Sequence, residues 1–264
     1  MGGSIVDAAD KMLERSPISY VANVGTPVLL LHGDADVMLS GGTHTMLHAL
    51  GITGFNRLTA LSTFDGDPKK ASRPFDATRD GMVPAEGAAL LVIESMEHAI
   101  NRGATILAEI LGHGVSSDAF HAVQPDRDGS GAARAIRWAL EDAEITSDEV
   151  DYINAHGTST PAGDMKELQA IKQVFNDKIP LIGSTKSLSG HALGAAGVNE
   201  SIYSLLMLEN DFVAESVNIE TLDEEAEGMP IVRKTTQVKL NRILSNSFGF
   251  GGTNACLVFE RFNQ

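Results

Sequence analysis

Apolar residues along the chain alternate between strand-like runs and runs at helical spacing. The strand-like runs occur at residues 27–33, 87–95, 105–111, 150–154, 213–219, 230–234 and 242–262. Apolar residues at helical spacing occur between them, at 94–103, 129–145, 165–175 and 198–210. Because strands and helices follow one another in this way, the pattern predicts an α/β fold rather than an all-α or all-β one.

Asp164 is the expected N-cap of the helix that runs to Phe175. A carboxylate at this position can accept a hydrogen bond from the first turn of a helix. Glu167 stands three residues later, which is the spacing of a capping box. The pattern therefore predicts a helix that begins at Asp164.

Composition and charge narrow the class of protein. The 264 residues are 43% hydrophobic, which is enough for one large domain or two small ones. A net charge of −15 disfavours binding of nucleic acid as the main task. The single cysteine cannot form an internal disulfide, and neither a signal peptide nor an apolar run of ~18 residues stands out. We therefore expect a cytoplasmic protein without a membrane span.

Three loops of the second half are rich in glycine, serine and threonine, and each follows a predicted strand. The loops and their candidate residues are 154–164 with His156, 183–197 with Lys186 and His191, and 245–255 with Phe248 and Phe250. Any one of these loops has a simple structural interpretation as a tight turn or a hydrogen-bonded histidine. Because strand ends at one edge of an α/β sheet assemble binding sites, the three loops together predict a shared pocket.

The same loops carry a resemblance to a known family. Residues 150–175, 184–209 and 245–260 resemble the C-terminal half of the β-ketoacyl-[acyl-carrier-protein] synthases of types I and II. With residues 33–63 and 69–95, the resemblance extends over about residues 34–262. It implies a thiolase-like fold, in which two similar α/β halves form five layers of sheets and helices.

The resemblance also implies roles for individual residues. His156 and His191 would be the active-site histidines, with Lys186 beside them. The other implied residues are Thr158 and Thr160 in the phosphopantetheine tunnel, Phe248 and Phe250 at its gate, and Glu200 and Asp164 as supporting carboxylates. Two imidazole N–H groups can stabilise the oxyanion of a malonyl thioester that loses carbon dioxide. No cofactor is implied, because the substrate itself carries phosphopantetheine or coenzyme A on an acyl carrier protein or as a free thioester.

The family also needs a cysteine nucleophile, and this chain has only Cys256. The nucleophile should stand a few tens of residues before 34–42, where this sequence has no cysteine. Cys256 begins the apolar run CLVFE, which predicts a buried strand with no helix behind it to lower the thiol pKa. We interpret Cys256 as a small apolar residue of the core and expect no full condensation.

Residues 9–36 resemble a different family, the α/β-hydrolases of the prolyl oligopeptidase type. In that family Asp36 would be the acid of a Ser-His-Asp triad, but the nucleophile elbow Gly-x-Ser-x-Gly is absent. The sequence thus predicts a chimera with a hydrolase-like segment at 1–36, a truncated first thiolase-like half at 37–114, and a complete second half at 115–264. The missing elements should leave apolar surface uncovered, so we expect a homo-oligomer.

Three functions remain open from the sequence. The first is an acyl-thioester-binding relative of the synthases that decarboxylates malonyl groups. The second is an esterase, in which a histidine activates water or one of three loop serines, Ser159, Ser187 and Ser189. The third is a folded fragment without catalysis.

Overall fold

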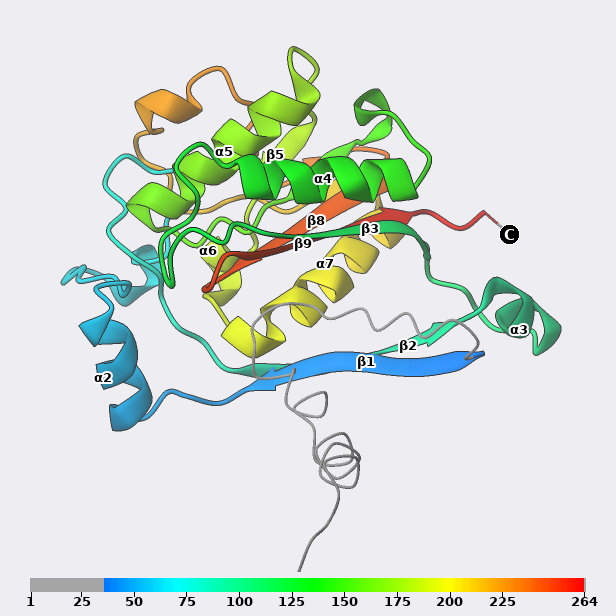
Figure 1. Cartoon of the computed structure of the whole chain (residues 1–264), viewed down its shortest axis with the longest axis horizontal. Helices are drawn as coiled ribbons and strands as arrows, with labels where there is room; N and C mark the ends of the chain where they lie inside the picture. The colour runs from blue at the N-terminus through cyan, green and yellow to red at the C-terminus, as the bar shows by residue number, and fades with distance from the viewer. Residues whose placement is uncertain (1–35, 264) are drawn as a thin grey trace, which may run out of the picture.

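The computed structural model describes residues 36–263, and its elements lie in layers (Figure 1). Helices α4 (Ser130–Asp142) and α5 (Pro161–Phe175) cover one face of a five-stranded sheet. Helix α7 (Ala196–Asn210) lies against the other face and separates this sheet from a two-stranded one. The layered α/β arrangement predicted from the sequence is therefore confirmed.

The larger sheet is mixed and has the strand order β3-β9-β8-β4-β5. Its strands are β3 (Glu109–Ser117), β4 (Tyr152–Asn154), β5 (Leu181–Gly183), β8 (Arg242–Gly249) and β9 (Thr253–Glu260). β4 pairs in parallel with both β5 and β8, whereas β9 pairs antiparallel with β8 and β3. The carboxyl ends of β4, β5 and β8 therefore lie at one edge. Because β3 begins at Glu109, the domain boundary expected at residue 115 falls inside this strand.

Two hydrophobic clusters lie on the two faces of this sheet. Along β9, Cys256 and Val258 belong to the cluster under α4 and α5, whereas Leu257 and Phe259 belong to the cluster beside α7. Successive side chains of a strand point to opposite faces, so a central strand covered on both sides must be apolar throughout. Cys256 is a buried strand residue, as expected.

The smaller sheet is an antiparallel pair of β1 (Val37–His44) and β2 (Gly87–Glu94). Both strands alternate between exposed and half-buried residues, because one face packs toward α7 and no other described helix or sheet packs on the opposite face. This opposite face carries Val37, Leu39, Leu90 and Val92, which are 47%, 67%, 70% and 61% exposed. The expected uncovered apolar surface is therefore present on this pair of strands.

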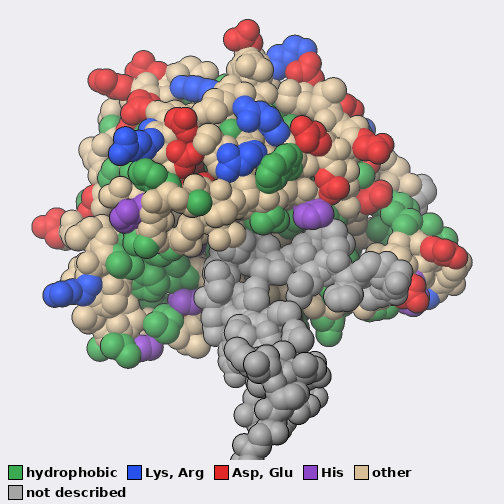
Figure 2. Space-filling model, viewed as in Figure 1, with side chains coloured by type: hydrophobic (Ala, Val, Ile, Leu, Met, Phe, Trp, Pro, Cys, Tyr) green, Lys and Arg blue, Asp and Glu red, His purple; other side chains and the backbone are tan. Residues whose placement is uncertain are grey.

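The remaining elements are short. They are α2 (Ala49–Arg57), α3 (Met96–Asn101), α6 (Lys186–Ser189), β6 (Phe212–Val213), β7 (Thr236–Gln237) and the 3-10 helices η3 (Pro68–Lys70), η4 (Ser147–Glu149), η5 (Leu193–Ala195) and η6 (Glu224–Ala226). Figure 2 shows acidic and basic side chains interspersed on the part of the surface where α4 and α5 lie. Within residues 36–263, no helix has the length and apolar character needed to cross a membrane.

Several sequence predictions were wrong in detail. Helix α5 begins at Pro161 with Thr160 as its N-cap, so Asp164 lies inside the first turn and caps nothing at that helix end. The strand expected at 230–234 is a single bridge between Ile231 and Ile182, and the one at 213–219 is reduced to the end of β6. Elements β1 and α2 were not predicted. The strand expected at 27–33 lies outside the described residues.

Candidate active site

The three predicted loops meet at one edge of the larger sheet. His156 follows β4, Lys186 and His191 follow β5, and Phe248 lies at the end of β8. Because these three strands run in parallel, their carboxyl ends bring the loops together. The fold therefore brings the three loops together at one edge of the sheet, as the sequence predicts.

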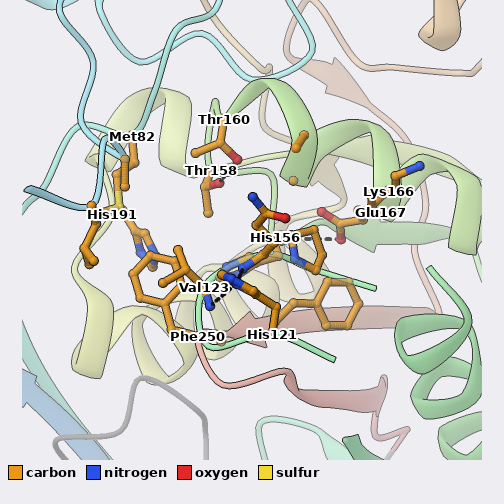
Figure 3. A pocket seen from close by; sticks show the side chains of 18 of the residues that line it. Met82, His121, Val123, His156, Thr158, Thr160, Lys166, Glu167, His191 and Phe250 are labelled. Atoms are coloured by element: carbon orange, nitrogen blue, oxygen red, sulfur yellow. Dashed lines mark hydrogen bonds between the residues drawn. The ribbon is translucent and has the colours of Figure 1, made fainter. Parts of the chain in front are cut away.

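A cavity of about 840 Å³ opens at this edge (Figure 3). Six of the candidate residues line it: His156, Thr158, Thr160, His191, Phe248 and Phe250. The hydroxyl oxygens of Thr158 and Thr160 lie 3.0 Å apart, and one donates a hydrogen bond to the other. A cavity of this size with a few convergent polar groups is typical of a small-molecule site.

The two histidines stand edge to face in this cavity. Their ring centroids are 5.3 Å apart with an interplanar angle of 86°, and the Phe248 ring lies 6.0 Å from that of His156. Burial lowers the pKa of both imidazoles well below the ordinary value, and Lys186 lowers both further. Nδ1 of His191 accepts a hydrogen bond from the Leu193 amide at 3.3 Å, so the proton of the neutral ring sits on Nε2. The site thus holds two neutral imidazoles, the form that donates to a developing oxyanion.

Glu167 holds the turn that presents His156, a role that no pattern in the sequence predicts. Its two carboxylate oxygens accept hydrogen bonds from the His156 and Gly157 amides, both at 2.8 Å. The Asn246 side chain donates a third hydrogen bond at 3.0 Å. Burial raises the pKa of Glu167, and these donors oppose that rise. The residue expected in a capping box therefore positions the loop of His156 instead.

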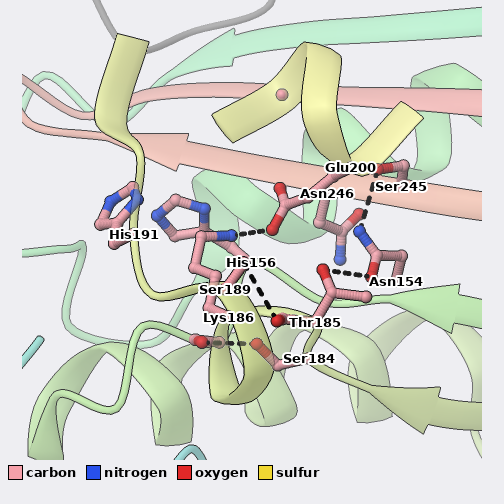
Figure 4. Close-up of polar contacts among 12 residues, drawn as sticks. Asn154, His156, Ser184, Thr185, Lys186, Ser189, His191, Glu200, Ser245 and Asn246 are labelled. Atoms are coloured by element: carbon pink, nitrogen blue, oxygen red, sulfur yellow. Dashed lines mark hydrogen bonds and ion pairs between the residues drawn. The ribbon is translucent and has the colours of Figure 1, made fainter. Parts of the chain in front are cut away.

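Lys186 does not line the cavity. Its ammonium group pairs with Glu200 on α7 behind His156 (Figure 4). Both side chains are almost completely buried, and burial raises the pKa of Glu200 to about 7 while the lysine opposes the rise. The charge of Lys186 contributes to the lowered pKa of both histidines, but Lys186 is not among the residues that line the cavity.

Asp164 ties the Thr158–Thr160 turn to the first half of the chain. Its carboxylate accepts hydrogen bonds from the Ser159 and Phe75 amides, both at 3.0 Å, and lies 3.3 Å from Nε of Arg79. Burial raises its pKa to about 7, against the pull of Arg79. Ser159 has a left-handed φ of 69°, a conformation that costs free energy and needs such anchoring. Asp164 thus fixes the backbone of this turn through hydrogen bonds and an ion pair.

Other candidates lie away from the cavity. Cys256, Ser159 and Ser187 are buried, Ser189 is exposed, and none of the four lines the cavity. Asp36 is exposed immediately before β1 and is also not part of the lining. The serines therefore do not stand where a hydrolytic nucleophile would be needed. Among residues 36–263, no three His, Cys, Asp or Glu side chains gather as metal ligands.

A mixed sheet with helices on both faces and a paired-histidine cavity at its edge is consistent with a thiolase-like α/β fold. One similar solved structure is the type II PKS acyl-carrier protein in complex with its ketosynthase bound to the hexaketide (TM-score 0.84, 37% identity, 88% of this chain and 58% of that chain). Another is a β-ketoacyl synthase from Burkholderia phymatum STM815 (TM-score 0.83, 41% identity, 88% of this chain and 56% of that chain).

The family models agree with this fold. The β-ketoacyl synthase N-terminal domain matches residues 28–99, and the C-terminal domain matches residues 107–220. Two models of one family thus match more than half of the chain, and the chain belongs to the β-ketoacyl synthase family. The 3-oxoacyl-[acyl-carrier-protein] synthase 1 of Haemophilus influenzae is 52% identical over 243 residues, or 91% of this chain and 58% of the relative. The chain therefore spans little more than half the length of this relative.

The family match also changes the interpretation of the N-terminal segment. It begins at residue 28, so residues 28–36 belong to the synthase match rather than to a hydrolase piece that extends to Asp36. The rest of the hydrolase-like segment, residues 9–27, lies outside the described residues.

Proposed function

We propose that this chain binds an acyl thioester in the histidine cavity and decarboxylates its malonyl form without an acyl-enzyme intermediate. The thioester is carried on phosphopantetheine, either of an acyl carrier protein or of coenzyme A. The observation that carries the proposal is the edge-to-face pair of imidazoles, His156 and His191, in one cavity.

The chemistry follows from where charge develops. The bond between C2 of the malonyl group and its carboxylate breaks, carbon dioxide leaves, and the electron pair moves to the thioester carbonyl oxygen. Hydrogen bonds from the two imidazoles stabilise that enolate oxygen. Water then supplies a proton to C2, and an acetyl thioester results.

Transfer of the enolate to a second acyl group would need a covalent carrier. Cys256 is the only cysteine of the 264 residues, and it is 1% exposed. Burial raises its pKa well above the ordinary value, so its reactive thiolate form is suppressed. We therefore expect decarboxylation to stop at the acetyl thioester.

The test is release of carbon dioxide and acetyl thioester from malonyl-pantetheine by the purified chain. We expect His156→Ala and His191→Ala each to lower the rate by about 10²-fold, the usual effect of removing one oxyanion donor. His98→Ala, a histidine of α3 outside the cavity, and Cys256→Ala should leave the rate unchanged. An acyl adduct on Cys256 in mass spectrometry, or equal rates in all variants, would overturn the proposal.

A second candidate is hydrolysis of short esters at the same cavity. Phe250 at the cavity is 44% exposed, which gives water access to a carbonyl held by the two histidines. With p-nitrophenyl acetate, His156→Ala should abolish turnover and Asp36→Asn should spare it. The opposite pattern would assign hydrolysis to the N-terminal segment.

A further inference from the structure

A third histidine, His44, lies in the same cavity, and neither decarboxylation nor hydrolysis uses it. It is the last residue of β1 and lines the cavity together with His156 and His191. Its Nε2 atom is buried, and no residue in the described part of the chain provides a hydrogen-bond partner. A buried polar atom without a partner costs free energy, so the molecule that fills the cavity is the natural source of one.

The backbone of β1 places His44 next to the loop of His191. A Cβ atom built on Gly42 would lie only 2.1 Å from the carbonyl oxygen of Gly194, so this part of β1 lies directly on the turn that follows His191. Alternate residues of a strand point to the same side, and the His44 side chain therefore points toward the same turn as Gly42. Two hydrogen bonds also join the His191 backbone to the segment before β2. The His191 amide donates to the Val83 carbonyl oxygen at 2.8 Å, and the Ala85 amide donates to the His191 carbonyl oxygen at 2.9 Å.

The charge state of His44 suits a neutral ligand. Burial lowers its pKa, and the nearby Glu86 carboxylate opposes this without reversing it. A neutral imidazole nitrogen either donates or accepts one hydrogen bond, depending on the tautomer. His44 can therefore pair with a hydroxyl or a carbonyl oxygen.

Apart from Arg57 and Thr59, the rest of the cavity wall from residues 37–114 is apolar and suits an aliphatic chain. Four apolar side chains from this part line the cavity: Phe55, Leu58, Ala60 and Met82. Such a wall favours binding of a hydrocarbon, and the binding free energy becomes more favourable as the ligand buries more apolar area. His44 adds a polar contact to that wall.

We propose that His44 is a specificity-determining residue that hydrogen-bonds an oxygen on the acyl chain. The cavity then prefers acyl groups with a hydroxyl or oxo substituent over unsubstituted groups of the same length. This inference rests on the proposed function, because it assumes that an acyl thioester occupies the cavity.

The test is the affinity of the purified chain for hexanoyl-, 3-hydroxyhexanoyl- and 5-hydroxyhexanoyl-pantetheine, measured by isothermal titration calorimetry. At least one hydroxylated probe should bind about two- to tenfold more tightly than hexanoyl-pantetheine, as one neutral hydrogen bond provides. His44→Phe keeps a ring but loses both nitrogens, so this preference should disappear while hexanoyl binding stays. His44→Gln, which keeps a polar group, should retain part of it. His113→Phe, a histidine of β3 outside the cavity, is the control.

Two results would overturn the inference: equal affinities for all three probes in the unmodified chain, or a preference that persists in both His44 variants. Failure of hexanoyl-pantetheine itself to bind would instead reject the proposed function. If His44→Phe does not fold, judged by circular dichroism, His44→Leu, which also lacks both ring nitrogens, takes its place in the comparison.

Discussion

At the scale of single residues, the two cavity histidines differ from an ordinary histidine in their pKa. Burial and the charge of Lys186 lower the pKa of His156 and of His191 well below 6.5. Both rings therefore stay neutral as pH falls through the range in which an ordinary histidine gains its proton. The unfolded chain would bind these protons near pH 6.5, so the two residues reduce the stability of the fold as pH falls below that value.

We predict that the imidazole rings of His156 and His191 do not gain a proton between pH 8 and pH 6. The measurement is a proton NMR titration of the histidine Hε1 resonances, with assignment from the resonance that each of His156→Ala and His191→Ala removes. A midpoint near pH 6.5 for either ring would show that burial does not lower its pKa and would remove the basis for neutral donors.

At the scale of elements, the contact between β1 and the turn after His191 depends on glycine at position 42. Gly42 has no room for a Cβ, since the nearest atoms are backbone atoms of Gly194 and Ala195. Backbone atoms cannot rotate away as a flexible side chain would. The first half of the chain is therefore fastened to the active-site loop at a position where only glycine fits.

We predict opposite effects for two glycine-to-alanine substitutions. Gly42→Ala should lower the free energy of unfolding by about 1–3 kcal/mol, the usual cost of overpacking, and lower the decarboxylation rate because His191 shifts. Gly54→Ala is the matched control: its added Cβ meets nothing within 4 Å, and α2 should gain about 0.5–1 kcal/mol from the better helix former. Urea denaturation measures both. Equal stability of Gly42→Ala and the unmodified chain would contradict the close approach.

Periodicity predicted the long elements better than the contacts between elements. Helices α4 and α7 and strands β8 and β9 were expected close to their observed positions, because each has one clear apolar pattern. Strand β1 was missed because Ser40, Gly41 and Gly42 interrupt its apolar run, and α2 because Gly51 and Gly54 are poor helix formers.

The candidate site was predictable where a residue type and its loop indicate chemistry. His156 and His191 are such residues. The roles of Glu167 and Asp164 depend on amides that are distant in sequence or outside the helix, so helix rules alone assigned these residues to the wrong task. His44 lies in no motif that indicates chemistry, and only the packing of β1 brings it to the cavity.

At the scale of the whole molecule, one face of the β1–β2 pair carries exposed apolar side chains. Its four apolar residues, Val37, Leu39, Leu90 and Val92, are 47–70% exposed. Extended apolar patches of this kind are uncommon on monomers and favour association. The expected homo-oligomer therefore has a surface on which it could form.

We predict concentration-dependent self-association through this face. Analytical ultracentrifugation of the unmodified chain should show a species larger than the 28.0 kDa monomer at micromolar concentrations. Leu39→Lys with Leu90→Lys should return it to the monomer, because like charges on neighbouring strands repel and the apolar area is lost. Leu188→Lys, an exposed leucine on α6, is the control and should not change the distribution. A monomer at all concentrations would contradict the prediction.

The ion pair of Lys186 and Glu200 has a consequence for side reactions. A thioester acylates any amine that reaches it with a free lone pair, so a lysine beside such a substrate risks consuming it and losing its own charge. Lys186 is 1% exposed, lies outside the cavity lining, and is held by the Glu200 carboxylate. With an acyl thioester in the cavity, as proposed above, this arrangement keeps a positive charge near the thioester and protects the lysine from acylation by it.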